Sequence, residues 1–423
     1  MNHSDIGYEQ ALGLALENVS PLGEEIIPIE RAVGRIISRS VPALVDSPSV
    51  DASFKDGYAV VSRDLVHAGP ENPVTLEIVG HAAAGEASAA VVRPGTTVRI
   101  LSGAALPPGA DAILAEEFVT VDGKYIHATA DAEPGRNVLE KGCDVCCHDM
   151  LAAKGDRLTP QRIGLMVAGG ISEVPVHQIP RIGLLATGSE ILLPGRPIGP
   201  GKVYASNMAL QQAWFLDRGI PSRVMASGDS IQSIADAIRQ LHAESDVIIT
   251  SGGAWKGDRD LVVSVLESLG WRQIFHRVRM GPGKAAGMGI LDGKPVFCLP
   301  GGPASNESAF IMIALPAVMK MAGFRNFPYM CLEGRLEKTV FGQADWTQFL
   351  QCDIIARTPE ILLRPGKLRS RLFAMARADA VLTIPEGVSR IPAGAVVPFI
   401  CLNPDLFSTS LPEHDRPVIP RRP

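Results

Sequence analysis

Three glycine-containing loops, two of which carry charged side chains, follow apolar runs in this 423-residue chain. They are "ATGSE" at 186–190, "TSGGAWKGDRD" at 250–260 and "LPGGPAS" at 299–305. Glycine lets backbone amides approach an anion closely, and a helix that begins after the loop adds a favourable partial charge. Each loop is therefore a candidate cradle for a phosphate or another oxyanion.

The charges in and beside these loops are of both signs. The acids are Glu190, Asp258 and Asp260, and the bases of the segment "RVRMGPGK" are Arg277, Arg279 and Lys284. Oxygen ligands bind Mg²⁺, while Lys and Arg neutralise phosphate, so this mixture suits an anionic ligand held with a divalent cation. Taken singly, each charge could equally belong to a surface ion pair, and each glycine could merely close a tight turn.

The elements that must position these loops alternate between strand and helix. From 181 to about 323, short apolar runs such as "RIGLLA" and "DVIIT" are separated by helix-like stretches. Ile231, Ile234, Ile238 and Leu241 recur at the helical spacing of three and four residues. The alternation predicts a doubly wound parallel sheet, in which ligands bind beyond the carboxyl ends of the strands. The three loops would meet at that edge.

The remaining chain has a different texture. Residues 4–19 predict an amphipathic helix with Ser4 as its N-cap, and Thr159 followed by Pro160 predicts another helix that ends near Gly169. Short β-type runs separated by Gly and Pro turns fill 46–147 and return after 326. The chain is therefore expected to hold a β-rich domain before the α/β domain and a small β-barrel or sandwich after it.

Composition excludes several classes of protein. Hydrophobic residues make up 46% and charged residues 20%, which is typical of a globular chain, and the net charge of −5 offers no general attraction to nucleic acid. No apolar run reaches the roughly 18 residues of a membrane span, and no secretion signal is recognisable, so a cytoplasmic protein is expected. Neither a dinucleotide-binding G-x-G-x-x-G fingerprint nor a G-x-S-x-G serine elbow is found.

The seven cysteines are expected to be reduced thiols, since nothing suggests an oxidising compartment. Four residues of "GCDVCCHD", namely Cys143, Cys146, Cys147 and His148, could ligate a soft metal. No second half-site with zinc-like spacing accompanies them. The alternative, a turn that contains buried thiols, is the favoured interpretation.

Further motifs appear earlier in the chain, in a fixed order with the glycine loops. They are "DASFKDGYAV" at 51–60, "VRILSGAALPPGADAI" at 98–113 and "GRNVLEKGCDV" at 135–145. Together with "ATGSEI" and "LPGGPAS", they resemble the molybdopterin molybdenumtransferase family, of the MoeA and gephyrin E-domain type. The resemblance covers essentially the whole chain.

The resemblance implies a multidomain α/β plus β fold and an elongated homodimer. Its domains would be a discontinuous linking and dimerisation domain at 1–45 and 148–178, a β-rich domain at 46–147, a doubly wound α/β domain of the MogA/MoaB type at 179–325, and a C-terminal β-barrel at 326–423. The active cleft would lie between the α/β domain of one subunit and the β-rich domain of the other.

The resemblance also implies a reaction, in which molybdate is inserted into the dithiolene of adenylylated molybdopterin and AMP is released with the help of Mg²⁺. Catalytic roles carry over to Asp56, Asp144, Glu190, Asp260 and Lys284, with Glu190 and Asp260 on the metal. Cofactor-binding roles carry over to Ser102, Thr187, Gly188, Ser251, Gly252, Gly253, Gly257, Pro300, Gly301 and Ser305. A molybdopterin adenylyltransferase and molybdoenzymes are the implied partners, with no nucleic acid and no membrane.

Departures from the family pattern cluster at the loops. Ser189 and Ala205 stand where the family has acids, Trp255 where it has a small hydroxyl residue, Gly281 where it has a lysine, and Gly302 where it has an asparagine. A charge-assisted contact is worth about 1.5–3 kcal/mol, so these losses could weaken ligand binding greatly. Arg279, Lys256 or Asp258 could compensate, and Trp255 would either stack on the ligand or fill space between domains.

The alternative function is a catalytically degenerate protein that binds or delivers molybdopterin or its cofactor; tungstate in place of molybdate is a further variation.

Overall fold

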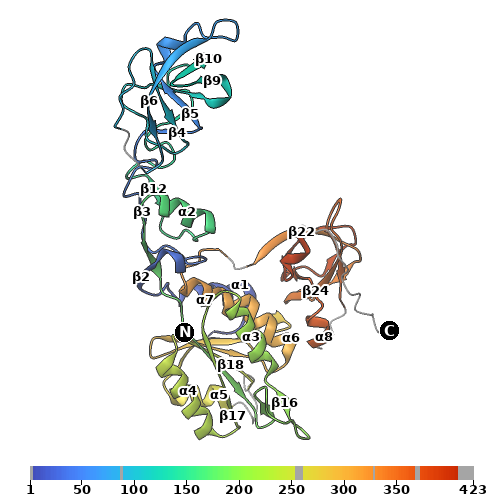
Figure 1. Cartoon of the computed structure of the whole chain (residues 1–423). Coiled ribbons are helices and arrows are strands. Elements are labelled where there is room, and N and C mark those ends of the chain that lie inside the picture. The colour runs from blue at the N-terminus through green and yellow to red at the C-terminus, as the bar shows by residue number, and fades with distance from the viewer. Residues whose placement is uncertain (1–2, 86–88, 253–260, 327–328, 367–371, 408–423) are drawn as a thin grey trace. The chain divides into compact units, whose positions relative to one another are not determined.

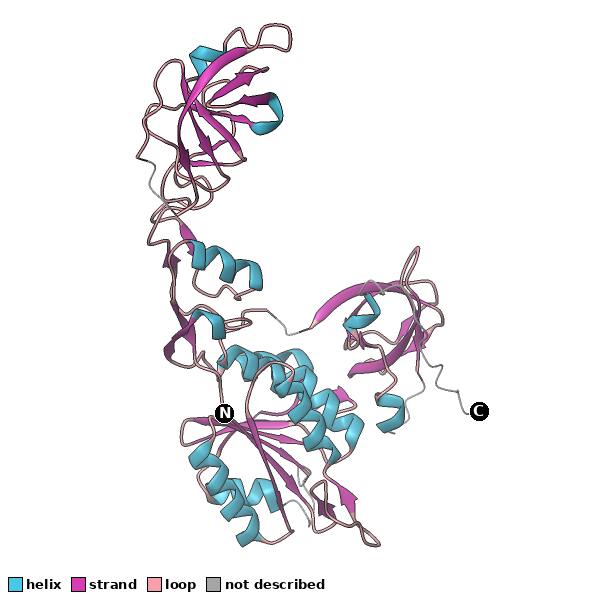
Figure 2. Cartoon of the chain, viewed as in Figure 1, coloured by secondary structure: helices cyan, strands magenta, loops and turns pink. Residues whose placement is uncertain are grey.

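The strand–helix alternation of residues 181–323 forms a largely parallel sheet in the computed structural model of the chain (Figures 1 and 2). The structure describes residues 3–85, 89–252, 261–326, 329–366 and 372–407. It divides into two units, one formed by residues 1–23 with 177–423 and the other by residues 24–176. The predicted division into four domains is finer than this one and stays a prediction.

Four parallel strands form the centre of the first unit, in the order β17–β14–β18–β21, and β20 and β19 extend the sheet in antiparallel fashion. Their bounds are β14 Ile182–Thr187, β17 Ser222–Ser227, β18 Val247–Ser251, β19 Arg272–Gly281, β20 Gly287–Leu291 and β21 Lys294–Leu299. Every residue of β14 and β18 is buried, as expected for strands covered on both faces. The predicted doubly wound sheet is confirmed.

Helices cover both faces of this sheet, and each face has its own hydrophobic core. One core includes side chains of α1 Tyr8–Glu17, α3 Ser206–Leu216, α6 Pro303–Ala309 and α7 Leu315–Met321, and the other those of α4 Ile231–Glu244 and α5 Leu261–Ser268. A π-helical turn, Phe310–Ala314, joins α6 to α7. In α4 the predicted apolar face is buried at Ile234, Ile238 and Leu241, whereas Ile231 in the first turn is exposed.

The N-terminal segment differs from its sequence-based prediction. Residues His3–Gly7 form strand β1, which pairs in parallel with β19, and helix α1 begins only at Tyr8 with Gly7 as its N-cap. The prediction of Ser4 as the N-cap was therefore wrong. Pairing with an available sheet edge, together with burial of Ile6, outweighs the local capping preference of serine.

The end of the chain forms a closed barrel of five strands. They are β22 Met330–Leu336, β24 Thr347–Ala356, β25 Leu362–Pro365, β26 Ala380–Ile384 and β28 Val396–Cys401. The pairs β24–β25, β25–β22, β22–β28, β28–β26 and β26–β24 complete the ring. A short helix, α8 Leu372–Met375, lies beside α6 of the α/β domain.

The second unit contains a six-stranded sheet and helix α2. The strands are β5 Gly57–Val60, β6 Val74–Ala82, β7 Thr96–Ile100, β8 Ala112–Ala115, β9 Val119–Asp122 and β10 Tyr125–Ala128. Helix α2, Pro160–Ala168, has the predicted caps: the Thr159 side chain accepts a hydrogen bond from the Arg162 amide, and Gly169 follows the last turn. In the described parts of the chain, no helix has the length and apolar character needed to span a bilayer.

Candidate functional site at the carboxyl edge of the parallel sheet

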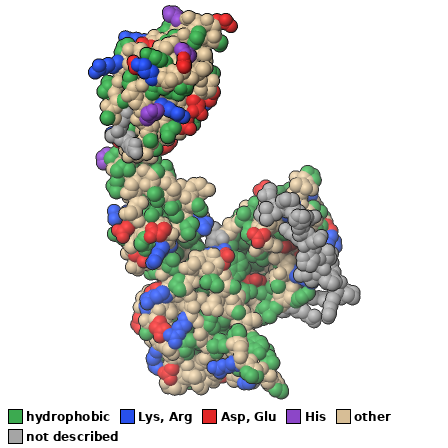
Figure 3. Space-filling model, viewed as in Figure 1, with side chains coloured by type: hydrophobic (Ala, Val, Ile, Leu, Met, Phe, Trp, Pro, Cys, Tyr) green, Lys and Arg blue, Asp and Glu red, His purple; other side chains and the backbone are tan. Residues whose placement is uncertain are grey.

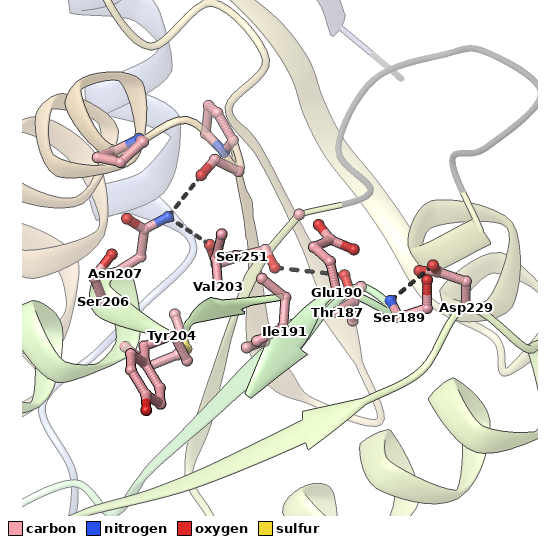
Figure 4. A pocket seen from close by; sticks show the side chains of 18 of the residues that line it. Thr187, Ser189, Glu190, Ile191, Val203, Tyr204, Ser206, Asn207, Asp229 and Ser251 are labelled. Carbon is pink, nitrogen blue, oxygen red and sulfur yellow. Dashed lines mark hydrogen bonds between the residues drawn. The ribbon is translucent and has the colours of Figure 1, made fainter. Parts of the chain in front are cut away.

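A cavity of about 1270 Å³ opens where the central strands of the α/β domain end (Figure 4). Its wall includes residues 186–191 after β14, Ser251 and Gly252 at the end of β18, and Pro300, Gly301 and Pro303 after β21. These are the three loops that the sequence singled out. The carboxyl ends of the parallel strands bring them to one edge, as the topology requires.

Two glycines have backbone conformations and close contacts that leave little room for a side chain. Gly188 has a φ of 148°, and a Cβ there would lie 2.7 Å from a carboxylate oxygen of Glu190. Gly252 has a φ of 99°, and a Cβ there would lie 2.7 Å from the carbonyl oxygen of Thr187. A larger residue at 252 would displace the Thr187 backbone, whereas at 188 the flexible Glu190 side chain could move aside, so crowding imposes glycine only at 252, while the positive φ favours glycine at both.

Among the residues that the structure describes, two carboxylates line the cavity. Glu190 was predicted, whereas Asp229, from the loop after β17, was missed. Asp229 accepts a hydrogen bond from the backbone amide of Ser189 at 2.8 Å and so holds the loop that carries Glu190 (Figure 4). The sequence did indicate Asp229, because the segment "GDS" at 228–230 follows a neighbouring parallel strand and therefore lies at the same edge of the sheet.

The first residues of several helices line this cavity, and α3 and α6 are two of them. Ala205, Ser206 and Asn207 at the start of α3 line it, as does Pro303 at the start of α6. Unsatisfied amides and the helix dipole favour negative charge at such ends. The cavity therefore combines hydrogen-bond donors for an anion with carboxylates for a cation.

The predicted site residues of the α/β domain separate into three groups. Those that line the cavity are Thr187, Gly188, Glu190, Ser251, Gly252, Pro300 and Gly301. Ser305 lies within α6 and is half-buried, but it is not part of the cavity wall. Gly253, Gly257 and Asp260 lie outside the described residues, as do Trp255, Lys256 and Asp258.

Two basic residues, Arg279 near the end of β19 and Lys284 in the turn before β20, make other contacts. The Lys284 ammonium lies 4.8 Å from the ring centroid of Trp346 in the barrel segment. The Arg279 guanidinium forms an ion pair with Glu386 at 2.8 Å and donates to the backbone oxygen of Asp5. The positive charge of Arg279 is thus engaged with the barrel and the N-terminal strand. Lys284 neighbours Ala285, which does line the cavity.

The predicted residues of the second unit lie on its exposed loops. A carboxylate oxygen of Asp56 accepts a hydrogen bond from the Ser102 amide at 2.7 Å, so the structure brings these two residues together. Asp144 is exposed on the loop whose backbone bonds to Ser47, and none of the contacts within the described residues joins it to Asp56. All three side chains are accessible to a ligand.

The cysteine cluster forms a turn, as favoured, but its thiols are not buried as that interpretation required. Cys143 and Cys146 are exposed and Cys147 is half-buried. The thiols of Cys146 and Cys147 donate to the carbonyls of Gly142 and Leu44, and the described residues contain no group of three or more potential metal ligands. The Cys147 amide donates a hydrogen bond to the carboxylate of Asp46. This bond, together with a smaller effect of Lys141, lowers the pKa of Asp46.

Comparisons with known proteins place this geometry in a family. Residues 6–170 match the model of the MoeA N-terminal region, domains I and II, and residues 183–320 match that of a probable molybdopterin binding domain. Molybdopterin molybdenumtransferase 2 of Mycobacterium tuberculosis is 30% identical over 375 residues, which cover 87% of this chain and 92% of that protein. The chain belongs to the molybdopterin molybdenumtransferase family.

Other members of the family agree with this assignment. The molybdopterin molybdenumtransferase of Bacillus subtilis is 28% identical over 380 residues, 88% of each chain. The solved structure of the molybdopterin biosynthesis MoeA protein from Pyrococcus horikoshii has a TM-score of 0.81 and 31% identity, and it covers 94% of this chain and 99% of its own. The predicted family and multidomain fold are confirmed.

Several departures from the molybdenumtransferase pattern lie at the cavity. Ala205 is 95% buried in the cavity wall and occupies the N-cap of α3 without any side chain that could cap it. Ser189 presents its amide, rather than an acid, to Asp229. An added Cβ at Gly302 or Gly281 would meet no atom within 4 Å, so neither glycine is imposed by crowding.

Proposed function

We propose that this chain inserts molybdate into adenylylated molybdopterin and releases AMP. The observation that carries the proposal is the convergence of Glu190, Asp229 and two helix N-termini on one cavity within the segment that matches a molybdopterin binding domain. Inserting an oxyanion while cleaving a phosphoanhydride needs amides for phosphate and carboxylates that bind a cation or accept a proton. The cavity supplies each of these groups.

Individual residues have distinct tasks in this proposal. The amides at the starts of α3 and α6 hold phosphate oxygens, and Gly301 permits close approach of the backbone. The amides of Gly188 and Gly252 instead donate to the carbonyls of Ser227 and Leu299, which fixes the two loops. Glu190 is the carboxylate that binds the cation or accepts a proton, and Asp229 orients its loop through the Ser189 amide.

The carboxylates also fit a divalent cation. Mg²⁺ is typically bound by one or two carboxylates together with substrate phosphates and water, and Glu190 and Asp229 offer two hard oxygen donors in one cavity. Asp260, the second predicted metal ligand, lies outside the described residues. Bound there, Mg²⁺ would neutralise phosphate charge as the anhydride is cleaved.

The site of this proposal is completed by a second subunit. Asp56, Ser102 and Asp144 of one subunit would face the cavity of the other in a homodimer, and their accessible positions support such a role. The adenylylated substrate would come from a molybdopterin adenylyltransferase, and the product would pass to molybdoenzymes.

The direct test measures AMP. Purified protein incubated with adenylylated molybdopterin, Mg²⁺ and molybdate should release AMP, and Glu190→Ala should abolish this release without loss of folding. A parallel incubation with tungstate establishes which oxyanion is accepted. Absence of AMP release with both oxyanions would overturn the proposal.

A second candidate function is binding and delivery of molybdopterin without turnover. The observation in its favour is Ala205, which leaves the wall of the cavity apolar where the family has an acid. Tight binding of adenylylated molybdopterin, with no AMP released under any condition, would establish this candidate. Turnover would eliminate it.

A further inference from the structure

A chain of buried amides lies directly under the floor of the cavity. Gln211 is fully buried and Asn306 is 1% exposed, and Nε2 of Gln211 donates to Oδ1 of Asn306 at 2.7 Å. Nδ2 of Asn306 donates to the carbonyl of Pro300 at 2.8 Å and to Oγ of Ser251 at 3.1 Å. The network thus connects helices α3 and α6 to two of the three loops.

The direction of every hydrogen bond in this network follows from backbone carbonyls. The oxygen of Pro300 can only accept, so Asn306 must present its NH₂ group on that side and its oxygen to Gln211. On the other side, Nδ2 of Asn207 donates to the carbonyl of Gly301 at 2.9 Å and to Oγ of Ser251 at 3.0 Å (Figure 4). The hydroxyl oxygen of Ser251 therefore receives two N–H groups.

This arrangement determines what Ser251 can offer to a ligand. A hydroxyl has two lone pairs and one proton, and both lone pairs of Ser251 are occupied by the two asparagines. Within the described residues no acceptor takes its proton, and the side chain lies in the cavity wall. The proton is left to point toward whatever fills the cavity.

We propose that Gln211 and Asn306 are positioning residues that hold the Ser251 hydroxyl as an obligate hydrogen-bond donor to an anionic oxygen of the substrate. The inference rests on the proposed function only for the identity of that substrate. A hydroxyl with its acceptor sites filled cannot rotate to present a lone pair, so the cavity discriminates in favour of acceptor oxygens at this point.

The cost of the network supports a role other than packing. Oε1 of Gln211 is buried and has no hydrogen-bond partner among the described residues. An unpartnered buried acceptor destabilises a fold, whereas two apolar side chains of similar size would satisfy the same space. The amide pair is therefore better explained by the loop and the hydroxyl that it orients.

A thiol introduced at position 251 tests the orientation without any ligand. In Ser251→Cys, two N–H donors aimed at the sulfur should stabilise the thiolate and lower the thiol pKa below about 8.5, the value of a free cysteine. Adding Gln211→Leu and Asn306→Leu together removes one donor from the sulfur, so the thiol pKa should rise; the same change also takes the Asn306 donor from the Pro300 carbonyl, so retained folding is checked by thermal unfolding. The thiol pKa is measured from the rate of alkylation as a function of pH, with the modified peptide that contains position 251 quantified by mass spectrometry. Equal pKa values in the two proteins would overturn the inference.

Binding of adenylylated molybdopterin tests the consequence. Ser251→Ala should weaken binding by about 10- to 100-fold, the loss of a hydrogen bond to a charged group. The Gln211→Leu, Asn306→Leu pair should weaken it to a similar extent, and combining it with Ser251→Ala should add little, because the pair acts through the hydroxyl. Losses that multiply would contradict the inference. The thiol pKa could rise as expected in a protein that binds no pterin. That result would support the orientation of the Ser251 hydroxyl and count against the proposed function.

Discussion

Asp229 and Glu190 show how two acids in one cavity divide their work. Asp229 uses one carboxylate oxygen to hold the Ser189 amide, while Glu190 projects from the loop that this bond restrains. The position of Glu190 further depends on the absence of a side chain at Gly188. A change at Asp229 should therefore alter catalysis through the position of Glu190 as well as through charge.

Substitution of Asp229 separates these two effects. Asp229→Ala removes the acceptor and should reduce kcat/KM for AMP release by about 10- to 100-fold, the equivalent of roughly 1.5–3 kcal/mol. Asp229→Asn keeps an oxygen that can accept from the Ser189 amide. Near-normal activity in Asp229→Asn would show a positioning role, whereas equal losses in both variants would show that the negative charge itself is needed.

The two glycine departures are also testable at single residues. Gly302→Asn and Gly281→Lys should each fold normally, within about 0.5 kcal/mol of the parent in unfolding free energy, because an added Cβ meets no atom within 4 Å. Each variant adds a polar or cationic group near the loops, so kcat/KM for AMP release should rise. Denaturant unfolding and AMP assays measure the two effects, and a loss above about 2 kcal/mol would refute the steric argument.

At the site, glycines needed for close backbone contacts could be predicted from the sequence, whereas the buried amide side chains could not. Gly188 and Gly252 could be identified because strand ends followed by glycine mark close backbone approach. Asn306 and Gln211 could not, because a polar residue inside a helical pattern does not show which partner satisfies it. Their pairing depends on the packing of α3 against α6, which sequence spacing alone does not specify.

At the scale of elements, helix α6 connects the cavity to the barrel. Asn306 faces the loop after β21, and the next residue, Glu307, accepts a hydrogen bond from Nε2 of Gln351 on β24 at 2.9 Å. Glu307 is 9% exposed, and this burial raises the pKa of its carboxyl to about 7. The α6–β24 contact thus contains an acid that titrates near neutrality.

This acid should make stability depend on pH. The pKa of Glu307 is about 7 in the folded chain and near its ordinary value of 4.5 when unfolded, so ionisation favours unfolding. Its contribution is fully retained below about pH 4.5, is lost progressively as the pH rises, and is gone above about pH 7. Glu307→Gln should therefore stabilise the protein at pH 8, by about 3 kcal/mol at most, and much less at pH 5.

Thermal unfolding at both pH values measures the effect of Glu307→Gln. The amide oxygen of the variant can still accept from Gln351, so the contact between the elements is kept. The exposed Glu267 on α5 provides a control, since Glu267→Gln should change the melting temperature little at either pH. An equal gain for Glu307→Gln at pH 5 and pH 8 would show that its burial does not govern the titration.

Elements with strong local signals were predicted correctly, and those created by pairing were not. Helix α2 has a capping threonine, a proline at its first position and a terminal glycine, and it begins and ends where these predict. Strand β1 has no comparable signal, because its conformation depends on the free edge of β19 from a distant part of the chain. Tertiary pairing therefore decided the one boundary that local rules missed.

At the scale of the molecule, a patch of exposed apolar side chains on the second unit fits a dimer contact. We define the patch by Leu44, Val45, Met150, Leu165 and Val167, which are between 40% and 62% exposed. The backbone of Leu44 bonds to Gly169 at the end of α2, which places these residues around one helix, and Figure 3 shows apolar side chains at the surface there. An exposed patch of this kind favours association.

If the subunits of the proposed homodimer meet at this patch, a charge within it should separate them. Val45→Glu would bury an unpaired carboxylate in the contact, which costs several kcal/mol and should weaken dimerisation by about 100-fold or more. Val121→Glu, at an exposed position on β9, serves as the control; Val121 is 56% exposed and Val45 is 46% exposed. Sedimentation analysis of both variants measures the change, and a dimer unaffected by Val45→Glu would exclude this patch as the contact.

Whether one site draws on two subunits can be decided by mixing inactive variants. Glu190→Ala disables the α/β contribution and Asp56→Ala disables the contribution of the β-rich unit, so each protein alone should release no AMP. If the cavity of one subunit is completed by its partner, a mixed dimer contains one site with both defects and one site with none. Because about half of the dimers formed on co-expression are mixed, about a quarter of the wild-type activity should return.

The matched control combines two defects from the same domain. Co-expression of Glu190→Ala with Lys284→Ala places one defect in every site of a mixed dimer, so no activity should return in either arrangement. Recovery with Asp56→Ala but not with Lys284→Ala would require that Asp56 and Glu190 act in one site from different chains. Failure of both mixtures would mean that each chain completes its own site, because then every site retains one of the two defects however the subunits associate.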